Sequence, residues 1–332
     1  MLENIWRKKG CFRGFLTAMM IALAAQFLAS HYKVPVMLFA LLLGLSFHFV
    51  YSDKEVRLGI DLTADFFLKL GVGLLGFRLS FENLQDIGLP SIIAVSITVF
   101  LTIIFGIFLA KVFRRDTSFG ILSGGSVAIC GASAAIAICT VLPKTEFRDR
   151  DMSLVIVGVT ILSTLTMIFY PILFAIFGMT DFAAGFIIGS AIHDVAQVVG
   201  AGYSISDEAG IIATFIKMIR VSLLPIVITV LLITINRSAT KKITVPWFLI
   251  LFFILVAIKY LFAIPTLIVD LVEVISSWLL IISIAAIGVR TSLASISSVS
   301  YIFGSILILE TLFLLFASFA CLYIFTFFKF FG

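Results

Sequence analysis

Long apolar stretches follow one another along almost the whole chain, separated by short polar loops. Most of them exceed the roughly 17–25 residues that a helix needs to cross a bilayer. A membrane-spanning helix bonds all its backbone groups internally. The pattern therefore predicts an all-α polytopic membrane protein with about 9–11 transmembrane helices in one transporter domain, residues 1–332. The apolar segments lie at about 14–30, 34–50, 60–77, 89–112, 117–142, 152–178, 182–203, 208–235, 246–262, 266–289 and 299–328.

Composition excludes a water-soluble protein. Of the 332 residues, 62% are hydrophobic and 12% are charged, against roughly 45–50% and about 25% in soluble domains. One water-soluble core cannot bury such a surplus. The net charge of +5 comes from basic residues in short loops, which indicates membrane topology and not nucleic-acid binding. The four cysteines form no CxxC pair, so no metal or cofactor is expected.

The basic residues also predict an orientation in the cell membrane. Basic residues 7–9 place the N-terminus in the cytoplasm. The first helix, about 15–29, is short for a full span. If segment 117–142 spans the membrane, the basic loop 144–150 falls on the outer side, whereas basic loops are expected on the cytoplasmic side. Either acidic residues in this loop weaken its bias, or segments 117–142 and 182–203 are both re-entrant, and the sequence leaves both interpretations open.

A weak internal repeat relates two segment ends. Residues 73–80, Gly-Leu-Leu-Gly-Phe-Arg-Leu-Ser, resemble residues 285–292, Ala-Ala-Ile-Gly-Val-Arg-Thr-Ser. Val-Pro at 34–35 recurs at 245–246. The odd offset of seven segments would turn one copy upside down relative to the other, as in many transporters. Chance similarity is the alternative. The two copies would cover about 34–142 and 182–328.

Residues 123–134 place glycines and small polar residues in the middle of an apolar segment. Non-helical backbone at membrane depth is tolerated only where it is buried in protein or lines a wet cavity. A break also creates a helix N-terminus, which attracts anions. The stretch predicts a broken or re-entrant helix at a substrate site, and close helix packing by small residues is the alternative. The candidate substrate-binding residues here are Gly124, Gly125, Ser126, Cys130 and Ser133.

A second polar group, in segment 182–203, predicts a second broken helix. Its candidate residues are Ser190, His193, Asp194 and Gln197. His193 and Gln197 are four residues apart and share a helix face. The group lacks the second histidine and the glutamate of a zinc helix, so no metal is expected. An intramembrane histidine beside an acid fits substrate binding and proton coupling, with a structural polar pair as the alternative.

Two cations, Lys217 and Arg220, lie within a long apolar segment on one helix face. A charge at the bilayer centre costs on the order of 2.5–3.5 kcal/mol. The pair therefore needs carboxylate partners, a water cavity or an anionic ligand. Arginine suits a tetrahedral oxyanion because it donates two parallel hydrogen bonds. Both residues are thus candidates for substrate binding.

Segment 60–77 contains Asp61, Asp65 and Lys69. Asp65 and Lys69 have the i, i+4 spacing of a helical ion pair, and Asp65 is also a candidate for proton coupling. These three charges and those of Asp194, Lys217 and Arg220 sum to zero. A purely structural account, with every cation paired, therefore stays open beside the functional one.

Two arginines and the C-terminal segment complete the pattern. Arg78 and Arg290 end their apolar segments and are expected as interfacial anchors, with a gating or substrate role as the alternative. The phenylalanine-rich stretch 312–331 is expected to face lipid.

The polar blocks resemble the YeiH family, which is also described as a conserved hypothetical membrane family and as sulfate exporters. The resemblance covers nearly the whole chain. It implies a bacterial or archaeal cell-membrane protein, related to bile-acid and arsenite-type transporters, with broken helices that cross at Gly124–Ser126 and around His193. The family commonly has glutamate after its histidine, where this chain has Asp194. The blocks that carry the resemblance are residues 124–126, 130–134 and 193–199, then Lys217 and Arg220 with 223–225.

The sequence favours a secondary transporter that exports a small anion, sulfate or a sulfonate, by alternating access. The expected partners are the anion and the lipid bilayer, and a homo-oligomer is left open. The chain is not expected to be an enzyme. The alternatives are an anion channel and an intramembrane enzyme that uses His193 and Asp194 with Cys130 or Ser126.

Overall fold

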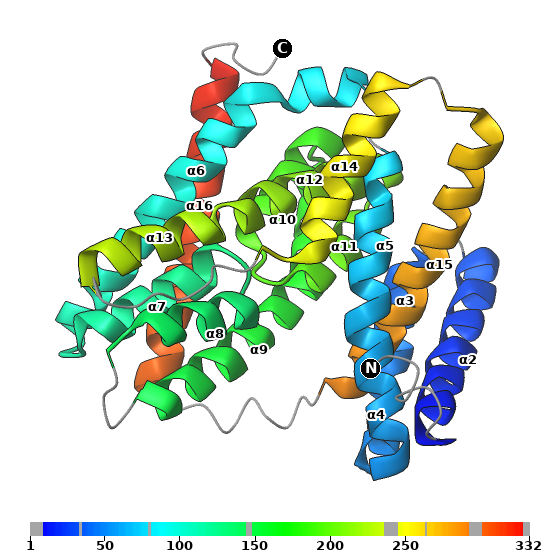
Figure 1. The fold of residues 1–332 in the computed structure, drawn as a ribbon, viewed down its shortest axis with the longest axis horizontal. Helices are drawn as coiled ribbons and strands as arrows, with labels where there is room; N and C mark the ends of the chain where they lie inside the picture. Colours follow the sequence, from blue (N-terminus) through cyan, green and yellow to red (C-terminus); the bar gives the residue numbers. More distant parts are fainter. Residues whose placement is uncertain are drawn as a thin grey trace. The chain divides into compact units, whose positions relative to one another are not determined.

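The computed structural model describes residues 9–32, 35–78, 81–143, 148–235, 245–262, 264–291 and 301–327, and nearly all of them are helical (Figure 1). Over these residues, six helices are long and apolar enough to cross a membrane, and four shorter apolar helices have 10–17 residues. The prediction of an all-α polytopic membrane protein is confirmed.

The chain forms two compact units that alternate along the sequence. Unit 1 comprises Met1–Glu82, Val199–Ile211 and Trp247–Leu293. Unit 2 comprises Asn83–Val198, Ile212–Pro246 and Ala294–Gly332. Both units therefore contain residues from both halves of the predicted repeat.

Unit 1 begins with α2, which is longer than the sequence predicts. It has 24 residues, not about 15, which is enough for a full span. Arg13 lies inside this helix and forms an exposed ion pair with Glu55 at 2.5 Å. The elements of unit 1 are α2 (Lys9–Tyr32), α3 (Val36–Ser46), η1 (His48–Ser52), α4 (Lys54–Leu62), η2 (Thr63–Phe67), α5 (Leu68–Leu74), η3 (Leu75–Phe77), the end of α11 (Val195–Tyr203), the start of α12 (Asp207–Ser222), α14 (Trp247–Leu261) and α15 (Thr266–Arg290).

Two glycines of the repeat make equivalent contacts within unit 1. A Cβ added to Gly76 would lie 2.3 Å from the carbonyl oxygen of Phe252, on α14. A Cβ added to Gly288 would lie 2.6 Å from the carbonyl oxygen of Leu41, on α3. Phe252 and Leu41 occupy the same position after the repeated Val-Pro pair. These two contacts are the ones expected if a two-fold axis relates the two stretches, and the inverted repeat stays a prediction.

Unit 2 contains helices that are interrupted within apolar segments. The chain leaves helical geometry between α7 and α8 and again between α10 and α11. A turn at Leu223, just before Pro225, separates α12 from α13. The elements of unit 2 are α6 (Phe81–Val112), α7 (Thr117–Ala128), α8 (Ala132–Val141), α9 (Arg148–Ile176), α10 (Asp181–Ala191), the start of α11 (Val195–Tyr203), most of α12 (Asp207–Ser222), α13 (Leu224–Ile235) and α16 (Tyr301–Phe327).

The sequence predicts that residues 312–331 face lipid. For 312–327 this is only partly correct, and 328–331 lie outside the described residues. One face of α16 is buried against α7, α9 and α10. Buried Leu314, Ala317 and Ser318 lie on that face, between exposed residues such as Phe316. Helix α16 is therefore part of the core of unit 2 (Figure 1).

Candidate functional site

The first helix break lies later in the chain than the glycine pair suggests. Gly124, Gly125 and Ser126 are inside α7, and the break comprises residues 129–131. The Ser126 hydroxyl donates to its own helix, to the Leu122 carbonyl at 2.5 Å. Gly131, with φ of 61°, holds the left-handed backbone from which α8 begins. The crossing position is therefore at 129–131, and Gly124 packs closely against α6.

The second break comprises residues 192–194, as the sequence predicts around His193. Ser190 lies before it, inside α10, and its hydroxyl donates to the Phe186 carbonyl at 2.7 Å. His193 and Cys130 lie in the two breaks and are both buried. The backbone N–H of Asp194 donates to the Ser163 hydroxyl at 3.1 Å.

Lys217 of α12 donates to carbonyls of both breaks. Its Nζ is 2.7 Å from the Ile129 oxygen and 2.9 Å from the Ile192 oxygen. It also donates to the His193 carbonyl. The ammonium has three protons and all three have acceptors. The side chain is fully buried.

Arg220, one turn further along α12, makes four bonds of the same kind. Nε donates to the Ala128 oxygen at 2.8 Å and Nη2 to the Val127 oxygen at 2.9 Å. Nη1 donates to the oxygens of Gly189 at 3.0 Å and Ile192 at 2.8 Å. The guanidinium thus joins the C-terminal end of α7 to that of α10.

Backbone carbonyls are the described hydrogen-bond partners of both cations, and the charge of Asp194 acts on Lys217 without a direct ion pair. Lys217 and Arg220 form no ion pair within the part of the chain that the structure describes. The last carbonyls of a helix have no partner within the helix and carry the negative end of its dipole. Two half-helices that end inside the protein therefore attract two cations. The sequence argument considered carboxylates, water and an anionic ligand as partners of the two cations, and it did not consider backbone carbonyls.

His193 links the first break to α16. Its Nδ1 is 3.2 Å from the Val127 oxygen, and its Nε2 is 3.0 Å from Thr311 Oγ1. Thr311 Oγ1 is also 2.7 Å from the Leu307 oxygen. When Nε2 carries a proton, it donates to Thr311 Oγ1, and the threonine hydroxyl donates to the Leu307 oxygen. When Nε2 is unprotonated, the threonine hydroxyl donates to Nε2 instead. The ring therefore has partners in both the neutral and the protonated form without movement of a heavy atom.

Lys217 and Arg220 already use their N–H groups to bond carbonyls, so the remaining hydrogen-bond donors near the breaks are the backbone N–H groups at the starts of α8 and α11. In α8 the Ala134 N–H donates to the Cys130 sulfur, while the N–H groups of 132, 133 and 195–197 have no backbone acceptor among the described residues. Ser133 is exposed in the first turn of α8. Gln197, in the first turn of α11, is 2% exposed, and its Oε1 has no hydrogen-bond partner. These two helix starts therefore hold backbone N–H groups and one amide oxygen without a partner among the described residues.

Glu310 is a buried polar residue that the sequence argument missed. It is fully buried in α16, next to Thr311. Its Oε1 accepts a hydrogen bond from the Ser123 hydroxyl of α7 at 2.7 Å, and its Oε2 has no partner. The available signal was an isolated acid in the middle of an apolar stretch. Helix α16 thus contacts both broken helices, through Glu310 and through Thr311.

We expect the substitution Glu310→Gln to change the free energy of unfolding by no more than about 1 kcal/mol. The amide keeps an acceptor for Ser123, and no described cation loses a partner. Glu310→Leu removes the acceptor and should lower stability more, by about 1–3 kcal/mol. Thermal denaturation in detergent compares the two variants. Equal losses in both would contradict the interpretation that the hydrogen bond, and not the charge, is what the fold uses.

The acidic residues of segment 60–77 lie in unit 1 and have other partners than expected. Asp65, in η2, pairs with Arg290 at 2.9 Å and not with Lys69. The π-helical turn of η2 displaces the i, i+4 spacing on which the expected pair depends. Asp61 accepts a hydrogen bond from the Tyr51 hydroxyl at 2.8 Å. Asp65 thus lies in a different unit from His193 and Asp194.

Comparison with known proteins places the chain among membrane proteins. The family described as conserved hypothetical protein 698 matches residues 13–302. The UPF0324 membrane protein CT0845 of Chlorobaculum tepidum is 43% identical, over 91% of this chain and 87% of the relative. The UPF0324 membrane protein TauZ of Paracoccus denitrificans is 42% identical, over 92% of this chain and 93% of the relative. No solved structure matches. These similarities confirm the family resemblance found in the sequence.

Proposed function

The chain belongs to the UPF0324 family of membrane proteins, and from this premise we propose that it is a secondary transporter of a small anion, sulfate or a sulfonate, that works by alternating access. The observation that supports this most is the pair of broken helices whose ends face Lys217 and Arg220 inside unit 2. Broken helices at mid-membrane are typical of substrate sites in secondary transporters.

In this proposal the anion binds at the starts of α8 and α11. The free N–H groups there carry the positive ends of the helix dipoles. Ser133 and Gln197 supply side-chain contacts beside Cys130. Lys217 and Arg220 act indirectly, because they fix the two breaks and add positive charge nearby. His193 accepts the coupling proton, with Asp194 beside it, and no enzyme activity is proposed.

Lys217 and Arg220 also bear on the coupling ion. In sodium-coupled transporters, unwound carbonyls and half-helix C-termini coordinate Na⁺. Here the carbonyls of Val127, Ala128 and Ile129 already accept bonds from the two side-chain cations. We therefore propose that transport does not require Na⁺.

The test is counterflow of labelled sulfate, and separately of labelled ethanesulfonate, in proteoliposomes. We expect flux above that of empty liposomes with at least one of the two anions, unchanged when choline replaces Na⁺. The isosteric variant Gln197→Glu adds a negative charge at the start of α11 and should reduce flux at least tenfold. Thr326→Glu adds the same charge at the exposed end of α16 and serves as the control.

The outcomes separate the parts of the proposal. Flux that disappears without Na⁺ would contradict the role given to the two cations. Equal flux in Gln197→Glu and Thr326→Glu would contradict the site. Flux that fails to saturate with anion concentration would favour the channel over the transporter.

A further inference from the structure

Arg78 is a mostly buried cation in unit 1 whose neighbours are all at long distance. Its side chain is 12% exposed, at the end of η3. Nη1 is 3.4 Å from the Tyr203 hydroxyl and Nη2 is 3.5 Å from Asp207. Nε is 3.8 Å from Glu273 and has no hydrogen-bond partner although it is buried. Good N–H···O bonds measure about 2.7–3.2 Å, so the guanidinium is under-coordinated.

The equivalent arginine of the repeat does not share this feature. Arg290 closes its ion pair with Asp65 at 2.9 Å. If both arginines were simple anchors, Arg78 would be expected to close a pair in the same way, since Glu273 and Asp207 are both within reach. The loose geometry is therefore particular to Arg78.

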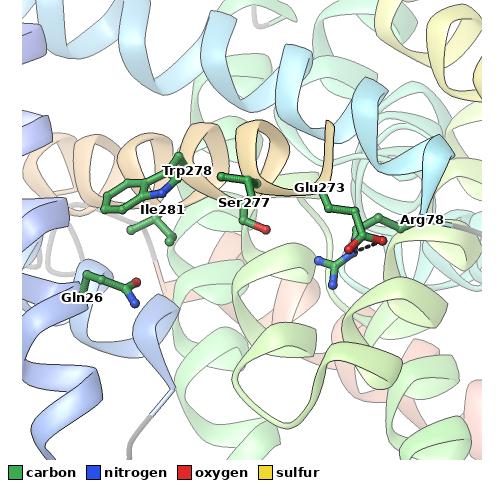
Figure 2. A pocket seen from close by; sticks show the side chains of 7 residues that line it. Gln26, Arg78, Glu273, Ser277, Trp278 and Ile281 are labelled. Carbon is green, nitrogen blue, oxygen red and sulfur yellow. Dashed lines mark ion pairs between the residues drawn. The ribbon is translucent and has the colours of Figure 1, made fainter. Parts of the chain in front are cut away.

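A cavity of about 260 Å³ opens beside Arg78. Figure 2 shows Arg78 and Glu273 at one end of it, Gln26 and Trp278 at the other, and Ser277 between them. A smaller cavity of about 100 Å³, lined by Tyr203 and Asp207, shares Arg78 and Ser277 with the first. The guanidinium thus borders two neighbouring spaces, and the larger one is of the size of a small metabolite.

The charges around this cavity select among small ligands. Arg78 contributes +1, and Asp207 and Glu273 contribute −2, which sums to 1 − 2 = −1. Lys259, whose Nζ donates to the Phe77 oxygen and whose charge acts on both Glu273 and Arg78, adds +1 and brings the sum to zero. A simple anion would gain one cation but face two carboxylates. A simple cation would leave the Nε–H of Arg78 without a partner. A ligand that carries both charges satisfies both sides, and buried polar groups strongly favour a partner.

We propose that this cavity of unit 1 binds a small zwitterion, an amine that also carries a sulfonate or carboxylate. The oxyanion accepts from Nε–H of Arg78 and from the Ser277 hydroxyl, which bonds no described group. The ammonium binds Glu273, and the Trp278 ring packs against the short carbon chain or the cation. This site is separate from the transport site proposed in unit 2, and its argument does not depend on transport.

The test is equilibrium binding to the purified full-length protein in detergent, by calorimetry and thermal shift. Three probes share one carbon skeleton: 2-aminoethanesulfonate carries both charges, ethanesulfonate only the anion and ethylamine only the cation. We expect saturable binding of 2-aminoethanesulfonate at least tenfold tighter than that of the other two. Arg78→Lys and Glu273→Gln should each weaken it at least tenfold. Arg290→Lys, the same change at the equivalent repeat position, should leave it unchanged.

Each contrary outcome overturns the proposal. Ethanesulfonate that binds as tightly as 2-aminoethanesulfonate would show a plain anion site. Binding that survives both Arg78→Lys and Glu273→Gln would place the ligand elsewhere. Absence of binding by all three probes would exclude the site. Ser277→Ala, which removes one hydroxyl, provides a second weakening variant if Arg78→Lys does not fold. Because no flux is measured, failure of sulfate counterflow leaves this result unaffected, and the reverse also holds.

Discussion

Arg220→Met should cause the largest loss of stability of any substitution considered. Methionine is apolar and nearly as long, so the loss comes from the carbonyls that it no longer bonds. Those of Ala128 and Gly189 lose the donor that Arg220 gives them, while Ile192 keeps Lys217. Each buried acceptor left unpaired costs about 1–3 kcal/mol. We expect a total of about 2–6 kcal/mol and a melting temperature lower by on the order of 10 °C.

Two variants control for this experiment. Arg220→Lys keeps the charge and three donors, and should retain part of the lost stability. Arg13→Met removes an arginine whose ion pair with Glu55 is exposed on both sides, and such pairs contribute at most about 1 kcal/mol. A melting temperature of Arg220→Met within about 2 °C of that of Arg13→Met would refute the role of Arg220 in joining the two breaks.

The second large effect is expected for Gly288→Ala, in unit 1. The added Cβ would lie 2.6 Å from the Leu41 oxygen and 2.8 Å from Gly44 Cα. Both are backbone atoms, so α3 and α15 must move apart. Overpacking of this kind costs about 1–3 kcal/mol, occasionally more. Gly76→Ala, whose Cβ would approach the Phe252 oxygen, should lose a similar amount if the two copies are equivalent.

Gly158→Ala is the matched control. Its added Cβ would lie 2.3 Å from Cδ1 of the buried Leu307 side chain, and no backbone atom is among its nearest neighbours. A shift of that side chain costs less than separation of two helix backbones, and helix propensity favours alanine by about 1 kcal/mol, so Gly158→Ala should lose less stability than Gly288→Ala. Loss in Gly158→Ala equal to that in Gly288→Ala would mean that backbone contact between α3 and α15 does not limit stability.

The apolar periodicity and composition were sufficient to predict the fold class, because the length and apolarity of a spanning helix are set by the lipid around it and not by its partners in the fold. Apolar length predicts a spanning helix, and mid-segment glycine predicts a break, as at Gly131. The position of the break was less predictable. Gly124 and Gly125 stand out by composition, yet they serve close packing, and of these three glycines only Gly131 has a positive φ.

The partners of the polar residues could not be predicted, because they lie far away in the sequence. Lys217 and Arg220 were recognised as unusual, but carbonyls are present at every residue and leave no trace in the sequence. Glu310 was missed because it stands alone in α16, and its partner Ser123 lies 187 residues earlier. The pairing of Asp65 with Arg290 likewise depends on how α15 packs in unit 1.

The order of synthesis gives the crossing of the broken helices a further significance. The Ala128 carbonyl leaves the ribosome 92 residues before the Arg220 guanidinium that bonds it. At about 5–20 residues per second, that interval is on the order of ten seconds. During this time the end of α7 has no donor for its carbonyl and cannot rest in lipid alone at low cost. Thr311, the partner of His193, is synthesised later still, 118 residues after His193. The half-helices must therefore wait in a wet or protein-lined environment, so this chain is expected to depend heavily on the insertion machinery until α12 and α16 have both arrived.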